Sequence, residues 1–184
     1  MAASILIVYY SMTGRTRPIA NELCRATNAD LEEIREPERR TGLPGIFRAL
    51  FDALLRRRTE IVKPMHDPAH YDLVILGGPI WAGRLASPVR SFARKYGPRA
   101  KQLAFFCTAG GPRADAAFAD LHRLCDRAPR ATCLVDASHL EPEAHRGELA
   151  HFVAQALRAS THAHVNATAS PAPGYRAPAP TPRR

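Results

Sequence analysis

Cysteine, lysine and tryptophan are all scarce in this chain of 184 residues. The four cysteines form no C-x-x-C pair, so a metal-binding or redox-active cysteine pair is not indicated. The histidines are scattered without the spacing of a metal site, and we expect no metal centre. Three of the cysteines lie in apolar patterns, which predicts free, mostly buried thiols in a reducing compartment. The four are Cys24, Cys107, Cys125 and Cys133.

Long hydrophobic runs are also missing. The first apolar segment, residues 5–10, is far too short to span a membrane, and no basic segment precedes it. We therefore predict no transmembrane segment and a cytoplasmic location. The hydrophobic fraction of 46% is enough for a buried core, and the length predicts one domain plus an extension.

Acidic residues are fewer than basic ones in this chain. Arginine and lysine together number 26 against 17 acidic residues, which gives a net charge of +9, and only three of the basic residues are lysine. A basic surface attracts nucleic acid, anionic lipid or acidic proteins. No helix-turn-helix, zinc-finger or RNA-binding signature accompanies the charge, so we predict no specific nucleic-acid binding.

Two familiar phosphate-binding motifs are absent, the Walker loop and the Gly-x-Gly-x-x-Gly fingerprint. A different loop takes their place between the apolar run 5–10 and a helix-patterned stretch. It reads Ser11, Met12, Thr13, Gly14, Arg15 and Thr16. Hydroxyls and backbone amides at a helix N-terminus suit a single phosphate monoester. The alternative is a simple turn in which a hydroxyl caps the helix.

Two further strand ends carry glycine-rich turns. The apolar run 71–76 leads into Gly77 to Gly83, which contains the single tryptophan, and the run 103–107 leads into a loop of small residues. In an open α/β sheet, ligands bind at the carboxyl ends of the strands. Together the three loops predict a site for a flat ring on a phosphorylated chain. The residues assigned to it after the first loop are Pro79, Ile80, Trp81, Ala82, Gly83, Thr108, Ala109, Gly110 and Gly111.

With these loops, the chain resembles the flavodoxin family, in its short-chain branch, over residues 4 to about 158. The first loop matches Ser/Thr-x-Thr-Gly-x-Thr, and Gly78 to Trp81 match the Gly-x-Pro-x-Trp turn of the family. The resemblance implies bound FMN as the cofactor. It implies that Trp81 or Ile80 lies against the isoalloxazine ring and that the loop 108–111 lies near its pyrimidine edge.

The chain departs from the family in two respects. The usual tyrosine of the third loop is missing, which predicts one open flavin face. Arginines replace the acidic surroundings typical of flavodoxins. The resemblance therefore does not imply that this chain docks on the basic partner proteins of that family. These arginines, expected to stabilise anionic reduced flavin, are Arg15, Arg17, Arg84 and Arg113.

Strand and helix patterns alternate along residues 1–159, which predicts a parallel sheet covered on both faces. The resemblance implies that these residues form a flavodoxin-like domain. We expect a doubly wound α/β fold with a five-stranded parallel sheet of order 2-1-3-4-5 in three α/β/α layers. Five helices are predicted. Two cover about 16–26 and 44–57, the third begins with Ser87 as its cap, and the last two lie near 118–125 and 149–157. The second strand, which is polar, is expected at 31–34. Residues 160–184, rich in Ala, Pro and Thr and free of acidic residues, are predicted to form a disordered basic tail.

These expectations lead to two functional hypotheses. The first is an FMN-binding redox protein that exchanges electrons with a partner protein or reduces a small acceptor such as a quinone, with NAD(P)H as a candidate donor. The alternative is a flavin-free binding or scaffold module on the same fold that docks to an anionic partner or surface. No nucleophile constellation or carboxylate pair stands out, so catalytic residues stay unassigned.

Overall fold

A parallel sheet forms the centre of the computed structural model, which describes residues 3–37, 59–111, 114–136, 138 and 142–165. The order β2-β1-β3-β5-β6 confirms the predicted topology, and a short strand, β4, adds an antiparallel partner to β3. The helix expected at 44–57 lies outside the described residues. The strands are β1 (Ile5–Tyr9), β2 (Asp30–Glu33), β3 (Leu73–Trp81), β4 (Arg84–Leu85), β5 (Leu103–Ala109) and β6 (Thr132–Asp136).

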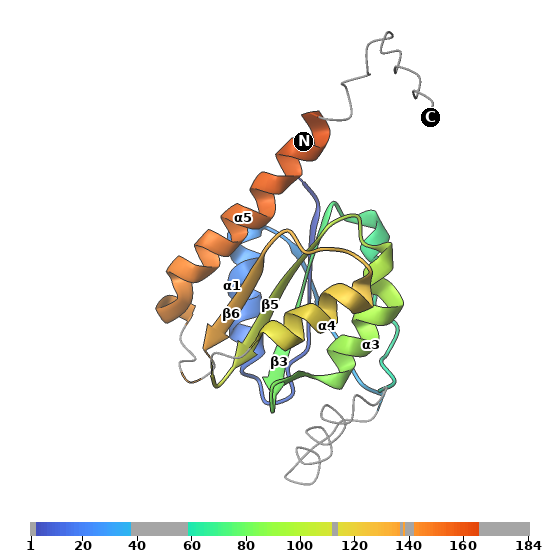
Figure 1. Cartoon of the computed structure of the whole chain (residues 1–184), viewed down its shortest axis with the longest axis vertical. Coiled ribbons are helices and arrows are strands. Elements are labelled where there is room, and N and C mark those ends of the chain that lie inside the picture. The colour runs from blue at the N-terminus through green and yellow to red at the C-terminus, as the bar shows by residue number, and fades with distance from the viewer. Residues whose placement is uncertain (1–2, 38–58, 112–113, 137, 139–141, 166–184) are drawn as a thin grey trace, which may run out of the picture.

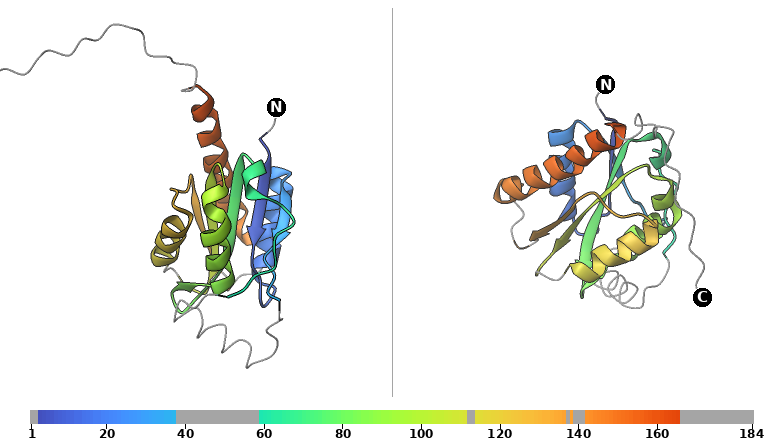
Figure 2. Two further views of the ribbon diagram at one scale, coloured as in Figure 1. Left: turned by 90° about the vertical axis from the view of Figure 1, so that its right-hand side faces the viewer. Right: turned by 45° about the horizontal axis from the view of Figure 1, so that its top comes forward.

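Helices cover both faces of this sheet (Figures 1 and 2). The α-helices are α1 (Thr16–Thr27), α3 (Ser87–Tyr96), α4 (Asp115–Cys125) and α5 (Arg146–Val165), and the short 3-10 helices are η1 (Pro68–His70), η2 (Gly97–Arg99) and η3 (Pro142–His145). Side chains of successive strand residues point to opposite faces. Leu6 and Val8 therefore pack with α3 and α4, whereas Ile5 and Ile7 pack with α1 and α5. The predicted three-layer arrangement is confirmed.

Two glycines let β3 run closely past its neighbours. A Cβ atom on Gly77 would lie 2.2 Å from the Phe106 ring, and one on Gly78 would lie 2.5 Å from Val89. The ladder between β3 and β5 continues through both glycines to Pro79, which is opposite Thr108. The sequence-based assignment of residues 77–81 to a turn was therefore wrong, because this ladder keeps 77–79 in the strand and pairing with β4 keeps Ile80 and Trp81 in it.

Helix ends differ from the expectations at two points. Ser87 is not the cap of α3 but its first residue, and the cap position belongs to Ala86, whose amide donates to the Pro79 carbonyl at 3.1 Å. At the other end of the chain, α5 continues to Val165, past the expected domain boundary at 159. No proline interrupts the sequence between Arg146 and Val165, so nothing in the backbone stops this helix earlier. The expected tail beyond it lies outside the described residues.

All four cysteines are free thiols, as predicted. Cys107, Cys125 and Cys133 are buried, and Cys24 is partly buried. Burial raises the pKa of the Cys125 thiol to about 12 and that of the Cys133 thiol to about 11. Reactive cysteines need an accessible thiolate, so these three buried side chains act as core residues.

Candidate functional site

The first predicted loop lies between β1 and α1. Its central residues, Thr13, Gly14 and Arg15, are exposed, and Gly14 has a φ of +86°, a conformation that favours glycine. The amide of Thr16 donates to the Ser11 hydroxyl at 3.2 Å. Ser11 therefore satisfies the first amide of α1 from within the loop, although the N-cap position itself belongs to Arg15, whose side chain makes no capping hydrogen bond. The exposed part of the loop stays at the positive end of the helix dipole.

The Thr16 side chain points into the protein. Its hydroxyl lies 2.9 Å from that of Thr108, and both residues are buried. Thr108 stands one residue before the end of β5, whereas Thr16 opens α1. This hydrogen bond ties the first loop to the third. Among the three hydroxyls of the first loop, that of Thr13 is the exposed one.

The second loop is a tight hairpin between β3 and β4. Trp81 is opposite Arg84 in the antiparallel pair, and only Ala82 and Gly83 connect them. Both have positive φ, +48° and +71°, which is the pattern of a type I′ hairpin turn. A left-handed conformation is uncommon for alanine, and such backbone positions concentrate at functional sites.

Trp81 is half-buried at the end of β3 instead of projecting from an exposed turn. Its indole meets the ring of Tyr10 edge to face, with the ring centroids 6.2 Å apart and the planes at 78°. Tyr10 is buried and follows β1 directly. In the sequence Tyr10 is only the end of an apolar run, and nothing local indicates a contact with a residue 71 positions away.

The three loops meet around one pocket of about 410 Å³. It opens where β1, β3 and β5 end, and the order of the sheet reverses between β1 and β3. Ten of the residues assigned from sequence line it: Met12, Thr13, Arg15, Thr16, Pro79, Ile80, Trp81, Thr108, Ala109 and Gly110. The others, Ser11, Gly14, Ala82, Gly83 and Gly111, belong to the same loops without lining the pocket.

Among the described residues, two of the four expected arginines lie at this pocket or on its hairpin. Arg15 lines it, and Arg84 stands beside Trp81 on the hairpin. Arg17 is instead paired with Glu33 at 2.7 Å, and this hydrogen bond raises the pKa of the Arg17 guanidinium. Arg113 lies outside the described residues. Arg15 is the charged residue of the described lining, so the pocket favours an anionic ligand.

The donor set and the dimensions fit a flavin mononucleotide. Pockets for ligands of this class usually measure roughly 300–1,000 Å³, and this one is within that range. Exposed Thr13 and Arg15 at a helix N-terminus suit a phosphate group. Ile80 and Trp81 offer apolar surface on which a ring can pack.

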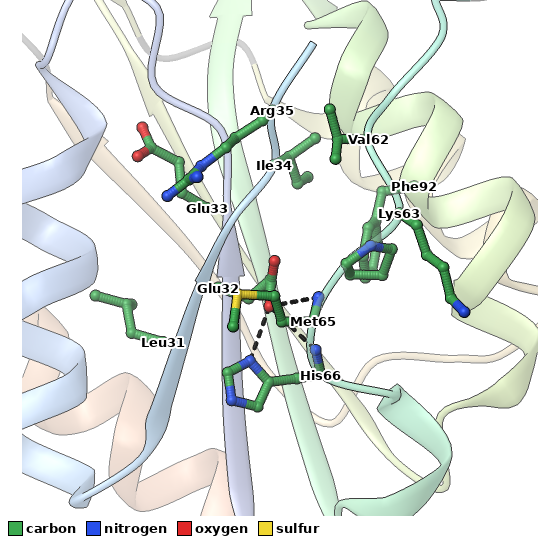
Figure 3. A pocket seen from close by; sticks show the side chains of 11 residues that line it. Leu31, Glu32, Glu33, Ile34, Arg35, Val62, Lys63, Met65, His66 and Phe92 are labelled. Atoms are coloured by element: carbon green, nitrogen blue, oxygen red, sulfur yellow. Dashed lines mark hydrogen bonds and ion pairs between the residues drawn. The ribbon is translucent and has the colours of Figure 1, made fainter. Parts of the chain in front are cut away.

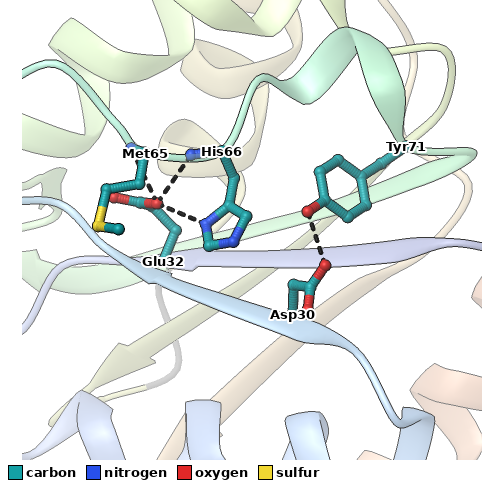
Figure 4. A network of polar contacts seen from close by, with 5 residues as sticks. All are labelled: Asp30, Glu32, Met65, His66 and Tyr71. Atoms are coloured by element: carbon teal, nitrogen blue, oxygen red, sulfur yellow. Dashed lines mark hydrogen bonds and ion pairs between the residues drawn. The ribbon is translucent and has the colours of Figure 1, made fainter.

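A second, smaller pocket of about 110 Å³ lies along β2 (Figure 3). Its most buried polar group is the Glu32 carboxylate, which accepts hydrogen bonds from the amides of Met65 and His66 at 3.1 and 3.2 Å. The Nδ1 atom of His66 lies 2.8 Å from the same oxygen (Figure 4). These contacts fasten residues 61–66 to the edge of the sheet. The sequence of β2 indicates only that the strand is polar.

Several findings concern membranes and metals. None of the described helices is long and apolar enough to cross a membrane. Within the described part of the chain, no group of three or more His, Cys, Asp or Glu side chains is arranged to hold a metal ion.

Solved structures identify the architecture. A flavoprotein from Lactobacillus acidophilus, determined in complex with FMN, superposes with a TM-score of 0.63 over 72% of this chain and 93% of its own, at 22% identity. A flavodoxin from Streptococcus pneumoniae superposes with a TM-score of 0.52 over 85% of this chain and 99% of its own, at 18% identity. The chain has a flavodoxin-like fold. The predicted resemblance is thus confirmed for the fold.

Sequence comparison adds one partial relative of this flavodoxin-like chain. An NAD(P)H dehydrogenase (quinone) from Azorhizobium caulinodans is 33% identical over 98 residues, which cover 52% of this chain and 47% of that protein. The match therefore spans about half the length of the curated relative. No protein-family model matches the chain.

Proposed function

We propose that this flavodoxin-like protein binds FMN in the 410 Å³ pocket and acts in electron transfer. The observation that carries the proposal is the meeting, in one pocket, of an exposed loop at a helix N-terminus with a half-buried indole. The first suits a phosphate and the second suits a flat ring. The FMN complex of the Lactobacillus acidophilus flavoprotein, which has the same fold, supports this assignment.

Each loop has a distinct part in this proposal. Thr13 and the backbone amides around Gly14 and Arg15 hold the phosphate, with Ser11 and Thr16 keeping the loop in shape. Trp81 and Ile80 contact the ring, and the residues 108–111 lie at its pyrimidine edge. When bound, FMN supplies the capacity to take up and release electrons, while these side chains set its affinity, orientation and exposure.

The partial match to an NAD(P)H dehydrogenase (quinone) supports an enzyme as one form of the proposal. In that form, NAD(P)H gives up a hydride, which carries two electrons and one proton, and leaves as NAD(P)+. A quinone takes up the two electrons with that proton and one from solvent and leaves as the quinol. In the other form, the protein exchanges electrons with a redox partner protein. Small residues at the third loop leave space beside the ring for a planar acceptor. For either form we propose a cytoplasmic location, because free thiols persist in a reducing compartment.

The test is an absorbance spectrum of the purified protein, followed by titration of the apoprotein with FMN and with riboflavin. We expect a flavin spectrum, and tighter binding of FMN than of riboflavin because the phosphate is recognised. NAD(P)H is then added with and without a quinone. Rapid NAD(P)H oxidation without a second protein supports the enzyme, and its absence supports the electron carrier. A protein that takes up no FMN contradicts the proposal and favours the flavin-free scaffold.

A further inference from the structure

Trp81 has only a short partner strand beside it. It stands at the end of β3, and the antiparallel partner β4 consists of Arg84 and Leu85 alone. The turn between them includes an alanine with φ of +48°. The direction of the indole at the pocket therefore depends on side-chain contacts, among which is its edge-to-face contact with Tyr10.

Tyr10 is itself held from the other end. Its ring is buried, and its hydroxyl donates to Oε2 of Glu36 at 2.7 Å. Hydrogen bonds to a carboxylate are shorter and stronger than those between neutral groups. Glu36 follows β2, whose continuation is aligned with β1 because the amide of Ile34 donates to the Tyr9 carbonyl at 2.7 Å. A line of contacts thus leads from the sheet edge through Tyr10 to the indole.

We infer that Glu36 and Tyr10 are positioning residues that hold Trp81 in the orientation it presents to the pocket, and so set the affinity of the site for a flavin ring. The inference rests on the proposed FMN site, and neither residue lines that pocket. Removing the Tyr10 hydroxyl leaves its ring in place but releases the ring's outer end. The ring can then turn, and the indole with it.

The structure supplies a matched control. The Tyr71 hydroxyl also donates to a carboxylate, that of Asp30, at 2.7 Å (Figure 4). The Tyr71 ring also meets another ring edge to face at 6.2 Å, but that ring belongs to His66 and not to Trp81. Tyr71→Phe therefore removes the same kind of hydrogen bond without touching the indole.

The experiment uses the full-length apoprotein first. Trp81 is the only tryptophan, and tyrosine does not absorb at the long-wavelength edge of the indole band. Fluorescence anisotropy excited at that edge, and near-ultraviolet circular dichroism read there, therefore report on Trp81 alone. We expect Tyr10→Phe and Glu36→Gln each to lower the anisotropy and weaken the indole signal. Tyr71→Phe should leave both unchanged. Unaltered indole signals in Tyr10→Phe overturn the inference, whether or not the protein binds FMN.

Flavin titrations then test the consequence. Tyr10→Phe and Glu36→Gln should each weaken FMN and riboflavin binding equally, by about 2- to 10-fold, because one hydrogen bond acts on the ring and not on the phosphate. The double variant should lose no more flavin affinity than the single variant with the larger loss, since both substitutions act through one contact. Additive losses, or a loss for FMN alone, contradict the inference. A parent protein that binds no flavin contradicts the proposed function instead.

Discussion

The hydroxyls of Thr16 and Thr108 lie 2.9 Å apart in the protein interior, although 92 positions separate them in the chain. One residue begins α1 and the other stands near the end of β5, so their contact joins two of the three loops around the pocket. A buried hydroxyl without a partner costs about 1–3 kcal/mol. This pair therefore contributes both to stability and to the shape of the site.

The pair can be tested by unfolding. Thr16→Val and Thr108→Val each keep the side-chain shape and leave one buried hydroxyl without this partner, so each should lower the free energy of unfolding by about 1–3 kcal/mol. The double variant should be less destabilised than the sum of the two, because neither hydroxyl is left behind. Urea titrations of the four proteins give the coupling energy. Strict additivity would show that the two hydroxyls do not interact.

Thr13 tests the phosphate assignment. Its side chain is exposed at the N-terminus of α1, and a hydrogen bond to a charged group contributes about 1.5–3 kcal/mol. Thr13→Ala should weaken FMN binding by roughly 10- to 100-fold and leave riboflavin binding nearly unchanged. Thr132→Ala, which removes an exposed hydroxyl from β6, is the control. An equal loss for both ligands in a fluorescence titration would remove the phosphate from this loop.

Arg84 tests the electrostatics of the pocket. A positive charge beside Trp81 stabilises anionic reduced flavin, so Arg84→Glu should make the two-electron midpoint potential more negative. A change of about 1 kcal/mol corresponds to roughly 20 mV for a two-electron couple. Arg25→Glu makes the same charge change in the last turn of α1, at the other end of that helix from the pocket, and should have little effect. The measurement is a dye-coupled titration at two salt concentrations, since salt screens such effects. Equal shifts in the two variants would show that the local position of Arg84 is irrelevant.

Asp72 gives a prediction for the pH dependence of stability. Hydrogen bonds from the Ser4 amide, then from Lys101 and the Ser4 hydroxyl, lower the pKa of its carboxyl to about 2. Because the folded pKa is below the unfolded one, ionised Asp72 stabilises the folded protein above about pH 4. That contribution disappears as the pH falls toward 2. The melting temperatures of the parent and of Asp72→Asn should therefore differ at neutral pH and converge in acid. A constant difference would contradict this account.

Local patterns in the chain were sufficient for the fold class and for the loops that surround the pocket. Alternating apolar segments predicted a parallel sheet covered on both faces, and the resemblance to flavodoxins supplied the strand order. Loops that end neighbouring strands meet at one edge of such a sheet whatever their detailed structure. Ten of the residues assigned from these patterns line the same pocket for that reason. The prediction that Ser87 caps α3 was wrong, because the residue at which a helix begins depends on the backbone path of the preceding hairpin.

The roles of individual side chains could be assigned only from the tertiary structure. Ser11, Thr13 and Thr16 look alike in the sequence. In the structure Ser11 accepts a hydrogen bond from the first amide of α1, Thr13 is exposed, and Thr16 is hydrogen-bonded to Thr108. Likewise, nothing in the residues around Tyr10 indicates that it links Glu36 to Trp81. Strand and helix periodicity arises from neighbours in the chain, which the sequence lists in order. Hydrogen bonds and ring contacts between distant segments depend on distances that exist only after the sheet has formed.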